Sequence, residues 1–216
     1  MEIQHILFDL DETLYQPGTG LWPILGSRMN LFIHSRLGIP MDQVEDIRER
    51  YYHTYGTSLR GLQVDYGVDA NEYLDFVHDV PITDFIHPDP KLQEILAKLP
   101  INKVIFTNAN KAHSKRVLKA LGVEQFFSSV IDVVDMEPYC KPYPEAFNTA
   151  MKLIGDLEPS HYMLFDDSIT NVRTAINLGM SAIQVSPTST NCDGITQINH
   201  IHEIVSVIPF LLNRDQ

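Results

Sequence analysis

A short apolar run near the start of the sequence ends in two carboxylates one residue apart. Residues 5–14 read HILFDLDETL, with no polar residue between positions 6 and 8. Such a run is typical of a strand buried on both faces, as in the middle of a parallel sheet. Open α/β sheets bind ligands at the carboxyl ends of their strands. We therefore expect Asp9 and Asp11 to lie at a ligand site.

The spacing of Asp9 and Asp11 also predicts a bound cation. Residues two apart in a strand point the same way, and beyond the strand the chain curls, so both carboxylates can face one site. Two close carboxylates resist ionising unless a cation joins them. A hard divalent ion such as Mg²⁺ fits oxygen ligands of this kind. Taken alone, the pair is equally compatible with a helix cap or a turn.

Residues 15–87 show helical periodicity and no strand pattern. We expect a helical bundle inserted after the first strand, with hinges near 15–18 and 87–90, where Gly and Pro favour turns. The sequence thus predicts two domains, namely an α/β core formed by residues 1–14 and 88–216 and a helical cap formed by residues 15–87.

Beyond residue 88 strand and helix patterns alternate. This alternation predicts right-handed crossovers and a doubly wound parallel sheet. We expect five or more strands with the first in the middle, because the polar ends of the later strands must converge on it. A last helix is expected from about residue 199, with a kink at Pro209. The later strands are predicted at 103–106, 130–134, 162–165 and 182–185.

Each later segment of the core brings polar groups to the same edge. Thr107 and Asn108 follow the second strand, where a hydroxyl and backbone N–H groups suit a phosphate oxygen. Lys141 follows the third strand, and Asp166 and Asp167 follow the fourth. Singly, these residues could be a helix entry, a surface lysine and a helix cap. Together they supply what phosphoryl transfer through an aspartyl-phosphate needs, namely a nucleophile, an acid/base and cations.

These segments resemble the four signature motifs of the haloacid dehalogenase-like hydrolase superfamily. The matching residues are FDLDETL at 8–14, TN at 107–108, KP at 141–142 and DD at 166–167. The helical insert resembles the first type of cap domain of that superfamily. The resemblance implies a Rossmann-like core, a Mg²⁺ cofactor and a small phosphorylated metabolite as the substrate.

The resemblance also implies a role for each motif residue. Asp9 would be the nucleophile and Asp11 the general acid/base. Lys141 would steady both the nucleophile and the phosphate. The residues expected to bind phosphate are Leu10, Thr107, Asn108 and Lys141, and those expected at the metal are Asp9, Asp11 through its backbone carbonyl, Asp167 and, close by, Asp166.

Two further features narrow the expected activity. Dehalogenases lack an acid at the position of Asp11 and P-type ATPases carry threonine there, so the chain resembles a phosphatase or mutase. Residues 51–62, with Leu14 and Tyr15, resemble the pyrimidine 5′-nucleotidase branch. We expect hydrolysis of nucleoside 5′-monophosphates, pyrimidine ones first. Arg60 on the cap is a candidate specificity residue, because a guanidinium can bind polar groups of a substrate.

Three alternatives share parts of this pattern. A phosphatase of pyridoxal phosphate or of a sugar phosphate would carry the same four motifs, and so would a phosphomutase. A receiver module that accepts phosphate on aspartate without turnover would need no helical insert above its acceptor site, so residues 15–87 disfavour it.

Bulk properties limit the partners. The net charge of −12 argues against a nucleic-acid polymer, which needs a basic surface. No apolar run is long enough to cross a bilayer, and the N-terminus lacks the pattern of a secretion signal. Cys140 and Cys192 are the only cysteines and lack metal-type spacing, which favours a reducing, cytoplasmic location without a disulfide. The oligomeric state stays open.

Overall fold

The computed structural model describes residues 3–188 and 194–208. Its strands form one sheet in the order β3-β2-β1-β4-β5-β6, and every neighbouring pair is parallel. The first strand therefore lies inside the sheet, as the sequence predicted. The strands are β1 His5–Phe8, β2 Asn102–Phe106, β3 Ser129–Ile131, β4 Tyr162–Asp166, β5 Ser181–Val185 and β6 Thr196–Ile198.

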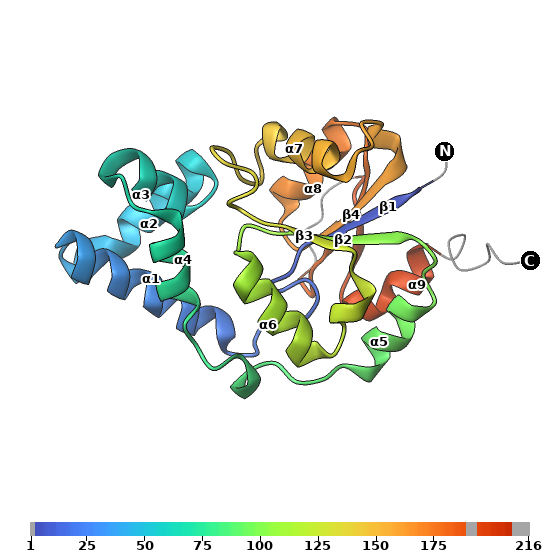
Figure 1. The fold of residues 1–216 in the computed structure, drawn as a ribbon, viewed down its shortest axis with the longest axis horizontal. Coiled ribbons are helices and arrows are strands. Elements are labelled where there is room, and N and C mark those ends of the chain that lie inside the picture. Colours follow the sequence, from blue (N-terminus) through green and yellow to red (C-terminus); the bar gives the residue numbers. More distant parts are fainter. Residues whose placement is uncertain (1–2, 189–193, 209–216) are drawn as a thin grey trace, which may run out of the picture.

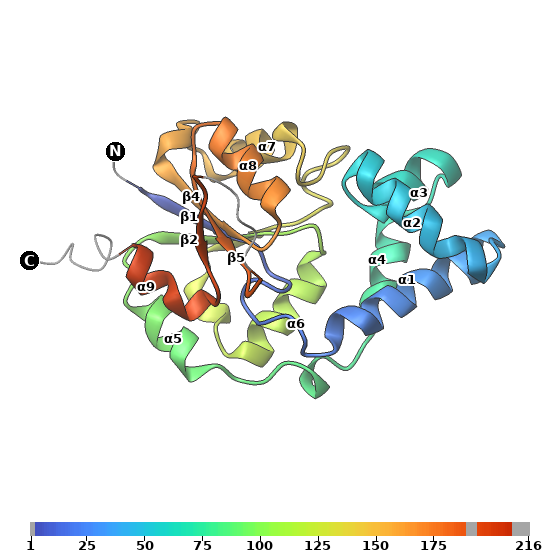
Figure 2. The same ribbon diagram turned by 180° about the vertical axis from the view of Figure 1, so that it is seen from behind.

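Helices cover both faces of the sheet, which confirms the doubly wound fold. Figures 1 and 2 show α7 and α8 on one face and α5, α6 and α9 on the other. Ile6, Leu7 and Phe8 of β1 are completely buried, as expected for a strand packed on both sides. The helices are α5 Pro90–Ala97, α6 Lys111–Leu121, α7 Pro144–Ile154, α8 Ile169–Asn177 and α9 Ile204–Val207.

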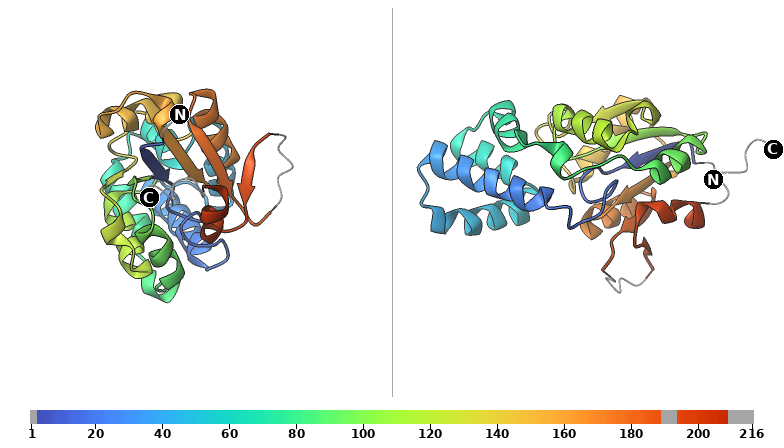
Figure 3. Two further views of the ribbon diagram at one scale, coloured as in Figure 1. Left: turned by 90° about the vertical axis from the view of Figure 1, so that its right-hand side faces the viewer. Right: turned by 90° about the horizontal axis from the view of Figure 1, so that it is seen from below.

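Four further helices lie together at one end of the core, beyond the carboxyl ends of the strands (Figures 1 and 3). We call them the cap. Local signals set their ends: the Thr57 hydroxyl accepts the backbone N–H of Arg60 at 3.2 Å, and Asp69 accepts that of Glu72 at 2.9 Å. The domain boundaries at 14/15 and 87/88 stay a prediction. The cap helices are α1 Leu21–Leu37, α2 Met41–Tyr55, α3 Ser58–Tyr66 and α4 Ala70–His78.

Some elements differ from the sequence-based expectation. β3 ends at Ile131, short of the predicted 130–134, because the Asp132 carboxylate accepts the N–H of Val134 and Asp135 and turns the chain. The C-terminal helix is one short turn, α9, after a 3₁₀ turn at Ile201–Glu203.

Some predictions concern residues that lie outside the described ranges. The kink at Pro209 is one, and the redox state of Cys192 is another. Cys140 is a buried free thiol. Within the described ranges, no helix has both the length and the apolarity that a bilayer crossing demands.

Candidate active site

The strand order brings three sequence-distant motifs to one edge of the sheet. β1 pairs with β2 on one side and with β4 on the other, and the backbone N–H of Asp9 extends the second ladder by donating to Phe165 O at 2.9 Å. Asp9, Thr107 and Asp166 are consequently the residues at the ends of three adjacent strands. This is the convergence that the alternating pattern predicted.

Lys141 joins two of these carboxylates in a buried ion pair. Its Nζ lies 2.7 Å from Asp9 Oδ1 and 2.7 Å from Asp166 Oδ2, and its side chain is 1% exposed. Burial would lower the pKa of Lys141, but the two carboxylates outweigh it and raise the pKa above its usual range. The lysine is therefore a fixed cation beside Asp9.

Asn108 locks the backbone of Lys141. Its side-chain Nδ2 donates to Lys141 O at 2.9 Å, and its Oδ1 accepts the Lys141 N–H at 3.0 Å. The amide predicted to bind phosphate thus connects the end of β2 to the lysine loop.

The Thr107 hydroxyl accepts the Ala109 N–H at 3.0 Å. Both Thr107 and Asn108 line the site cavity. Leu10 is fully buried and does not line the cavity, and since its side chain is apolar, only its backbone N–H has the chemistry to bind phosphate.

Asp9, Asp166 and Asp167 could hold a metal ion. They offer ligand oxygens that all lie within 4.8 Å of one another. Both oxygens of Asp166 already accept hydrogen bonds. Oδ2 accepts one from Lys141 Nζ, and Oδ1 accepts one from the Ser168 N–H at 2.9 Å and one from Asn171 Nδ2 at 2.8 Å.

The Asp167 carboxylate, by contrast, has no hydrogen-bond partner among the described residues. Burial, with repulsion from its neighbours, raises the pKa of Asp9 to about 7 and that of Asp167 to about 8. Two carboxylates that resist ionising because they are buried and lie beside other carboxylates fit a hard divalent cation. Their pKa values, Asp167's free oxygens and the 4.8 Å cluster therefore suit Mg²⁺.

Two side chains that the sequence analysis did not connect with Asp11 hold it in place. The Tyr15 hydroxyl donates to Asp11 Oδ1 at 2.8 Å, and His113 Nε2 lies 2.8 Å from the same oxygen. Burial would raise the pKa of Asp11, but His113 outweighs it and the pKa is lowered. His113 is completely buried and stacks on His78 of the cap, with ring centroids 4.2 Å apart. One Asp11 oxygen is thus fixed while the other is left for chemistry.

The turn after β1 makes this arrangement possible. Glu12 adopts the left-handed region with φ 60°, which a residue with a side chain enters at a cost. The next residue, Thr13, donates to Asp9 Oδ2 at 3.3 Å and accepts the Asp167 N–H at 3.0 Å. Its hydroxyl therefore ties the two motif aspartates to the same turn.

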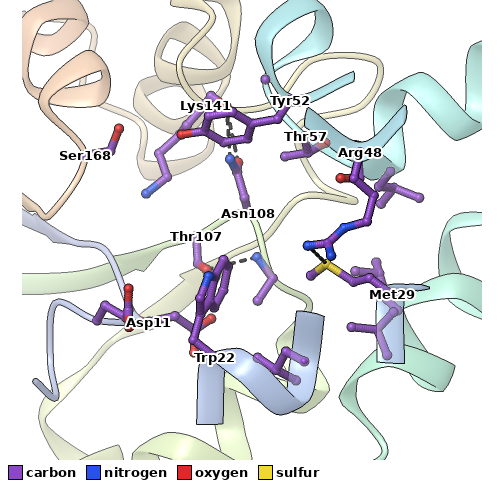
Figure 4. Close-up of a pocket in the computed structure, with 18 of the residues that line it drawn as sticks. Asp11, Trp22, Met29, Arg48, Tyr52, Thr57, Thr107, Asn108, Lys141 and Ser168 are labelled. Carbon is purple, nitrogen blue, oxygen red and sulfur yellow. Dashed lines mark hydrogen bonds between the residues drawn. The ribbon is translucent and has the colours of Figure 1, made fainter. Parts of the chain in front are cut away.

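The motif residues open into a cavity of about 590 Å³ between core and cap. Figure 4 shows Asp11 and Lys141 on one side of this pocket and Arg48 and Met29 on the other. The core contributes Asp9, Asp11, Thr107, Asn108, Lys141 and Asp167 to its lining, and the cap contributes Trp22, Leu25, Met29, Arg48, Tyr52, Tyr73, Leu74, Val77 and His78, among others.

Arg60 does not line this cavity. Its guanidinium donates to Glu137 Oε1 at 2.9 Å, to Val133 O at 2.5 Å and to Tyr139 O at 2.8 Å. The cap residue is 5% exposed and fastens α3 to the loop that carries Lys141. The structure therefore does not support the expectation that Arg60 reads a substrate in this cavity: its two outer nitrogens donate to the core loop and lie outside the cavity.

Comparison with known proteins places the chain in a family. The family model described as "Hydrolase: haloacid dehalogenase-like hydrolase" matches residues 3–179. The chain belongs to the haloacid dehalogenase-like hydrolases. The membership in this superfamily that the four motifs predicted is confirmed. Membership in its pyrimidine 5′-nucleotidase branch stays a prediction.

One curated relative is Phosphate metabolism protein 8 of Saccharomyces cerevisiae. The two sequences are 33% identical over 193 residues, which is 82% of this chain and 59% of the yeast protein. The chain thus spans less than two thirds of that relative's length.

Solved structures share the fold. The HAD-hydrolase YfnB from Bacillus subtilis, solved with bound magnesium, superposes with a TM-score of 0.65 at 17% identity, covering 97% of this chain and 100% of that one. A HAD phosphatase from Thermococcus onnurineus superposes with a TM-score of 0.60 at 22% identity, covering 96% of this chain and 97% of that one. L-2-haloacid dehalogenase from Xanthobacter autotrophicus superposes with a TM-score of 0.60 at 16% identity, covering 96% of this chain and 98% of that one. The fold thus carries different activities.

Proposed function

We propose that this chain is a Mg²⁺-dependent phosphomonoesterase that works through an aspartyl-phosphate and acts on nucleoside 5′-monophosphates, pyrimidine ones first. The observation that carries the proposal is the contact between the Asp9 carboxylate and the buried Lys141, 2.7 Å apart, at the floor of the cavity under the cap. A fixed cation beside a carboxylate suits attack on an anionic phosphate.

The reaction balances in two steps. First, an Asp9 oxygen forms a bond to phosphorus while the bond from phosphorus to the leaving oxygen breaks. Asp11 gives that oxygen a proton from its protonated form, which is the minor form because the pKa of Asp11 is lowered. Second, Asp11 takes a proton from a water molecule, whose oxygen attacks the phosphorus. Inorganic phosphate leaves, and Asp9 regains its carboxylate. The single free oxygen of Asp11 is the one that exchanges the proton.

The remaining residues hold the phosphoryl group. Lys141 and the Thr107 hydroxyl line the cavity beside Asp9 and would bind the equatorial oxygens. Asp9 and Asp167 would hold Mg²⁺, with Asp166 anchored to Lys141. The metal, when bound, neutralises charge on the phosphoryl oxygens. The magnesium of YfnB and the name of the yeast relative support this reading by analogy.

Asp11 also favours phosphate over halide as the leaving group. A leaving alkoxide must be protonated, whereas a halide needs no proton, so a positioned acid serves a phosphatase. Asp11 Oδ1 is held at 2.8 Å by two partners, which is the geometry of a group kept in place for proton transfer.

The first prediction concerns the metal. We expect hydrolysis of p-nitrophenyl phosphate and of UMP to be lost in EDTA and restored by Mg²⁺. Because an ion that binds only the folded state stabilises it, Mg²⁺ should also raise the melting temperature, and Asp167→Asn should remove that rise. Exposed Asp46 gives the control Asp46→Asn, which should keep it. Full activity in EDTA would contradict the metal dependence. Hydrolysis of p-nitrophenyl phosphate but not of UMP would contradict only the proposal that nucleoside 5′-monophosphates are the substrates.

The second prediction concerns His113. His113→Phe keeps a ring against His78 but removes the nitrogen that contacts Asp11. We expect kcat for an alkyl phosphate to fall roughly 10²-fold, the scale of general acid catalysis. The fall for p-nitrophenyl phosphate should be smaller, since p-nitrophenolate leaves without a proton. His53→Phe, on an exposed face of α2, is the control. Equal losses for both substrates would mean that His113 serves only packing.

A further inference from the structure

The loop that carries Lys141 connects β3 to α7 and comprises residues 132–143. Figures 1 and 2 show it, in yellow, reaching beyond the sheet towards α2 and α3 of the cap. The core fixes the start of this loop, because the Asp132 carboxylate accepts the backbone N–H of Lys111, Val134 and Asp135. The position of the lysine, near the other end of the loop, depends on further contacts.

The corner between α2 and α3, which we define as residues 54–60 and call the cap corner, supplies such contacts. The Tyr143 hydroxyl donates to Thr54 O at 2.6 Å, and the Cys140 thiol donates to Tyr55 O at 3.3 Å. Both donors lie within two positions of the lysine, one before it and one after it. The cap corner therefore holds the loop on each side of the residue that carries the ammonium.

Arg60, in the first turn of α3, binds the earlier part of the same loop. Its two outer nitrogens donate to Val133 O at 2.5 Å, to Tyr139 O at 2.8 Å and to Glu137 Oε1 at 2.9 Å. A guanidinium presents its donors in a fixed planar fork, so the acceptors are held in one arrangement. Because the residue is only 5% exposed, a change in the shape of the loop would leave a buried charge without partners, which is unfavourable.

Gly56 brings the cap backbone directly against Lys141. Its φ of 83° lies in the left-handed region, which glycine enters without a steric penalty and which ends α2 here. A Cβ at this position would lie 2.9 Å from Lys141 O, 3.0 Å from Cys140 Sγ and 3.1 Å from Pro142 Cδ. The same Lys141 carbonyl accepts a hydrogen bond from Asn108 Nδ2 (Figure 4). The lysine backbone thus lies between a side chain of the core and the backbone of the cap, with no room for a methyl group.

We propose that Gly56 and Arg60 are positioning residues for Lys141, so that the cap corner and Asn108 together set where the lysine ammonium lies beside Asp9. The inference rests on the proposed function, because it concerns the cation that acts on the phosphoryl group. A misplacement of reacting groups by about 1 Å can slow a reaction about 10²-fold. The cap corner can therefore govern the rate through the loop, and Arg60 has this task in place of reading a substrate.

Gly56→Ala tests the inference with a single methyl group. The new Cβ must displace the Lys141 carbonyl or move the cap corner away from it, so we expect kcat to fall about tenfold or more. The lysine acts on the phosphoryl group and not on the leaving group. The loss should consequently be the same for p-nitrophenyl phosphate and for UMP.

Gly38→Ala is the matched control. Gly38 ends α1 with φ 71°, is exposed, and has open space around a Cβ position among the described residues. Both variants place an alanine in the left-handed region, so the control should lose about 2–4 °C in melting temperature and Gly56→Ala at least as much. Only Gly56→Ala should lose activity, which separates positioning from stability.

Arg60→Lys provides a second variant that keeps the charge but not the planar fork. A lysine ammonium cannot hold the three acceptors of the guanidinium in one plane, so kcat should again fall about tenfold, equally for both substrates. Arg36→Lys is its control, because the Arg36 side chain is 58% exposed and lies on α1. It should retain the kcat of the wild type.

The ammonium of Lys141 gives a readout that needs no activity. Its side chain is 1% exposed and paired with two carboxylates, so its protons exchange slowly with water and should give a ¹⁵N–¹H NMR signal, identified by its loss in Lys141→Arg. The signal should shift in Gly56→Ala and Arg60→Lys and stay in place in Gly38→Ala.

The outcomes separate this inference from the proposed function. If the wild type hydrolyses no phosphate ester but the ammonium signal shifts in Gly56→Ala and Arg60→Lys alone, the proposed activity fails and the positioning of Lys141 by the cap corner stands. If the wild type is active and both variants keep its kcat, if the loss is confined to UMP, or if the signal does not move, the inference is overturned.

Discussion

Asp9→Asn is expected to abolish hydrolysis while leaving the fold intact. The amide has the shape of the carboxylate but cannot attack phosphorus, so turnover of p-nitrophenyl phosphate should fall about 10⁴-fold or more, as when other covalent nucleophiles are removed. Stability should not fall, because burial and the adjacent Asp166 already disfavour the charged form of Asp9. Lys141 keeps its contact with Asp166 at 2.7 Å, so the buried ammonium stays paired.

Initial rates and melting curves of the purified variant test this. Asp46→Asn, which makes the same chemical change on an exposed part of α2, should behave as the wild type. Rapid acid quenching followed by mass spectrometry should show a phosphoryl group on the peptide containing Asp9 in the wild type and none in Asp9→Asn. Unchanged turnover in the variant, or a phosphoryl group elsewhere, would remove Asp9 from the mechanism.

The positions of the motif residues could be predicted because parallel strands end at a common edge. Asp9, Thr107 and Asp166 each follow a buried strand, and a doubly wound order brings those ends together. Lys141 lies in a loop after the third strand, so the sequence pattern placed its ammonium near the carboxylates, and the resemblance to the family gave it the role of steadying Asp9. The structure shows how the contact is kept, through two hydrogen bonds between the Asn108 side chain and the lysine backbone, one donated by each residue.

The cap was harder to predict for a physical reason. A helical pattern shows which face of a helix is buried but not whether that face meets the core, another helix or a cavity. Arg60 and Arg48 both lie on cap helices, and only packing shows that the first is engaged by Glu137 and backbone carbonyls while the second lines the cavity. The contact of His113 with Asp11, 102 positions apart, leaves no local signal in one sequence.

Lys141→Met is expected to damage both activity and stability, which separates it from Asp9→Asn. The variant leaves Asp9 and Asp166 buried without their cation. Breaking a buried ion pair by removing one partner costs about 3–5 kcal/mol, which is roughly 10 °C in melting temperature for a chain of this size. Lys98→Met is the control, because Lys98 is 64% exposed and, among the residues that the structure describes, pairs with Glu94 on the surface. It should change neither property noticeably.

The pH dependence of this loss identifies its cause. Without Lys141, the pKa of Asp9 in the folded protein, already above the usual value for aspartate, is expected to rise further, because burial then acts without the compensating charge of the lysine. At a pH between the pKa of the carboxyl in the unfolded chain and its higher pKa in the folded protein, the folded protein holds a proton that the unfolded chain has released. Stability therefore falls as the pH rises from the first of these pKa values to the second. The melting temperature of Lys141→Met should therefore lie closer to that of the wild type at pH 5 than at pH 8. Adding Asp166→Asn should recover part of the stability at pH 8 but no activity. A deficit that is the same at both pH values would show that the lysine stabilises the fold by packing rather than by charge.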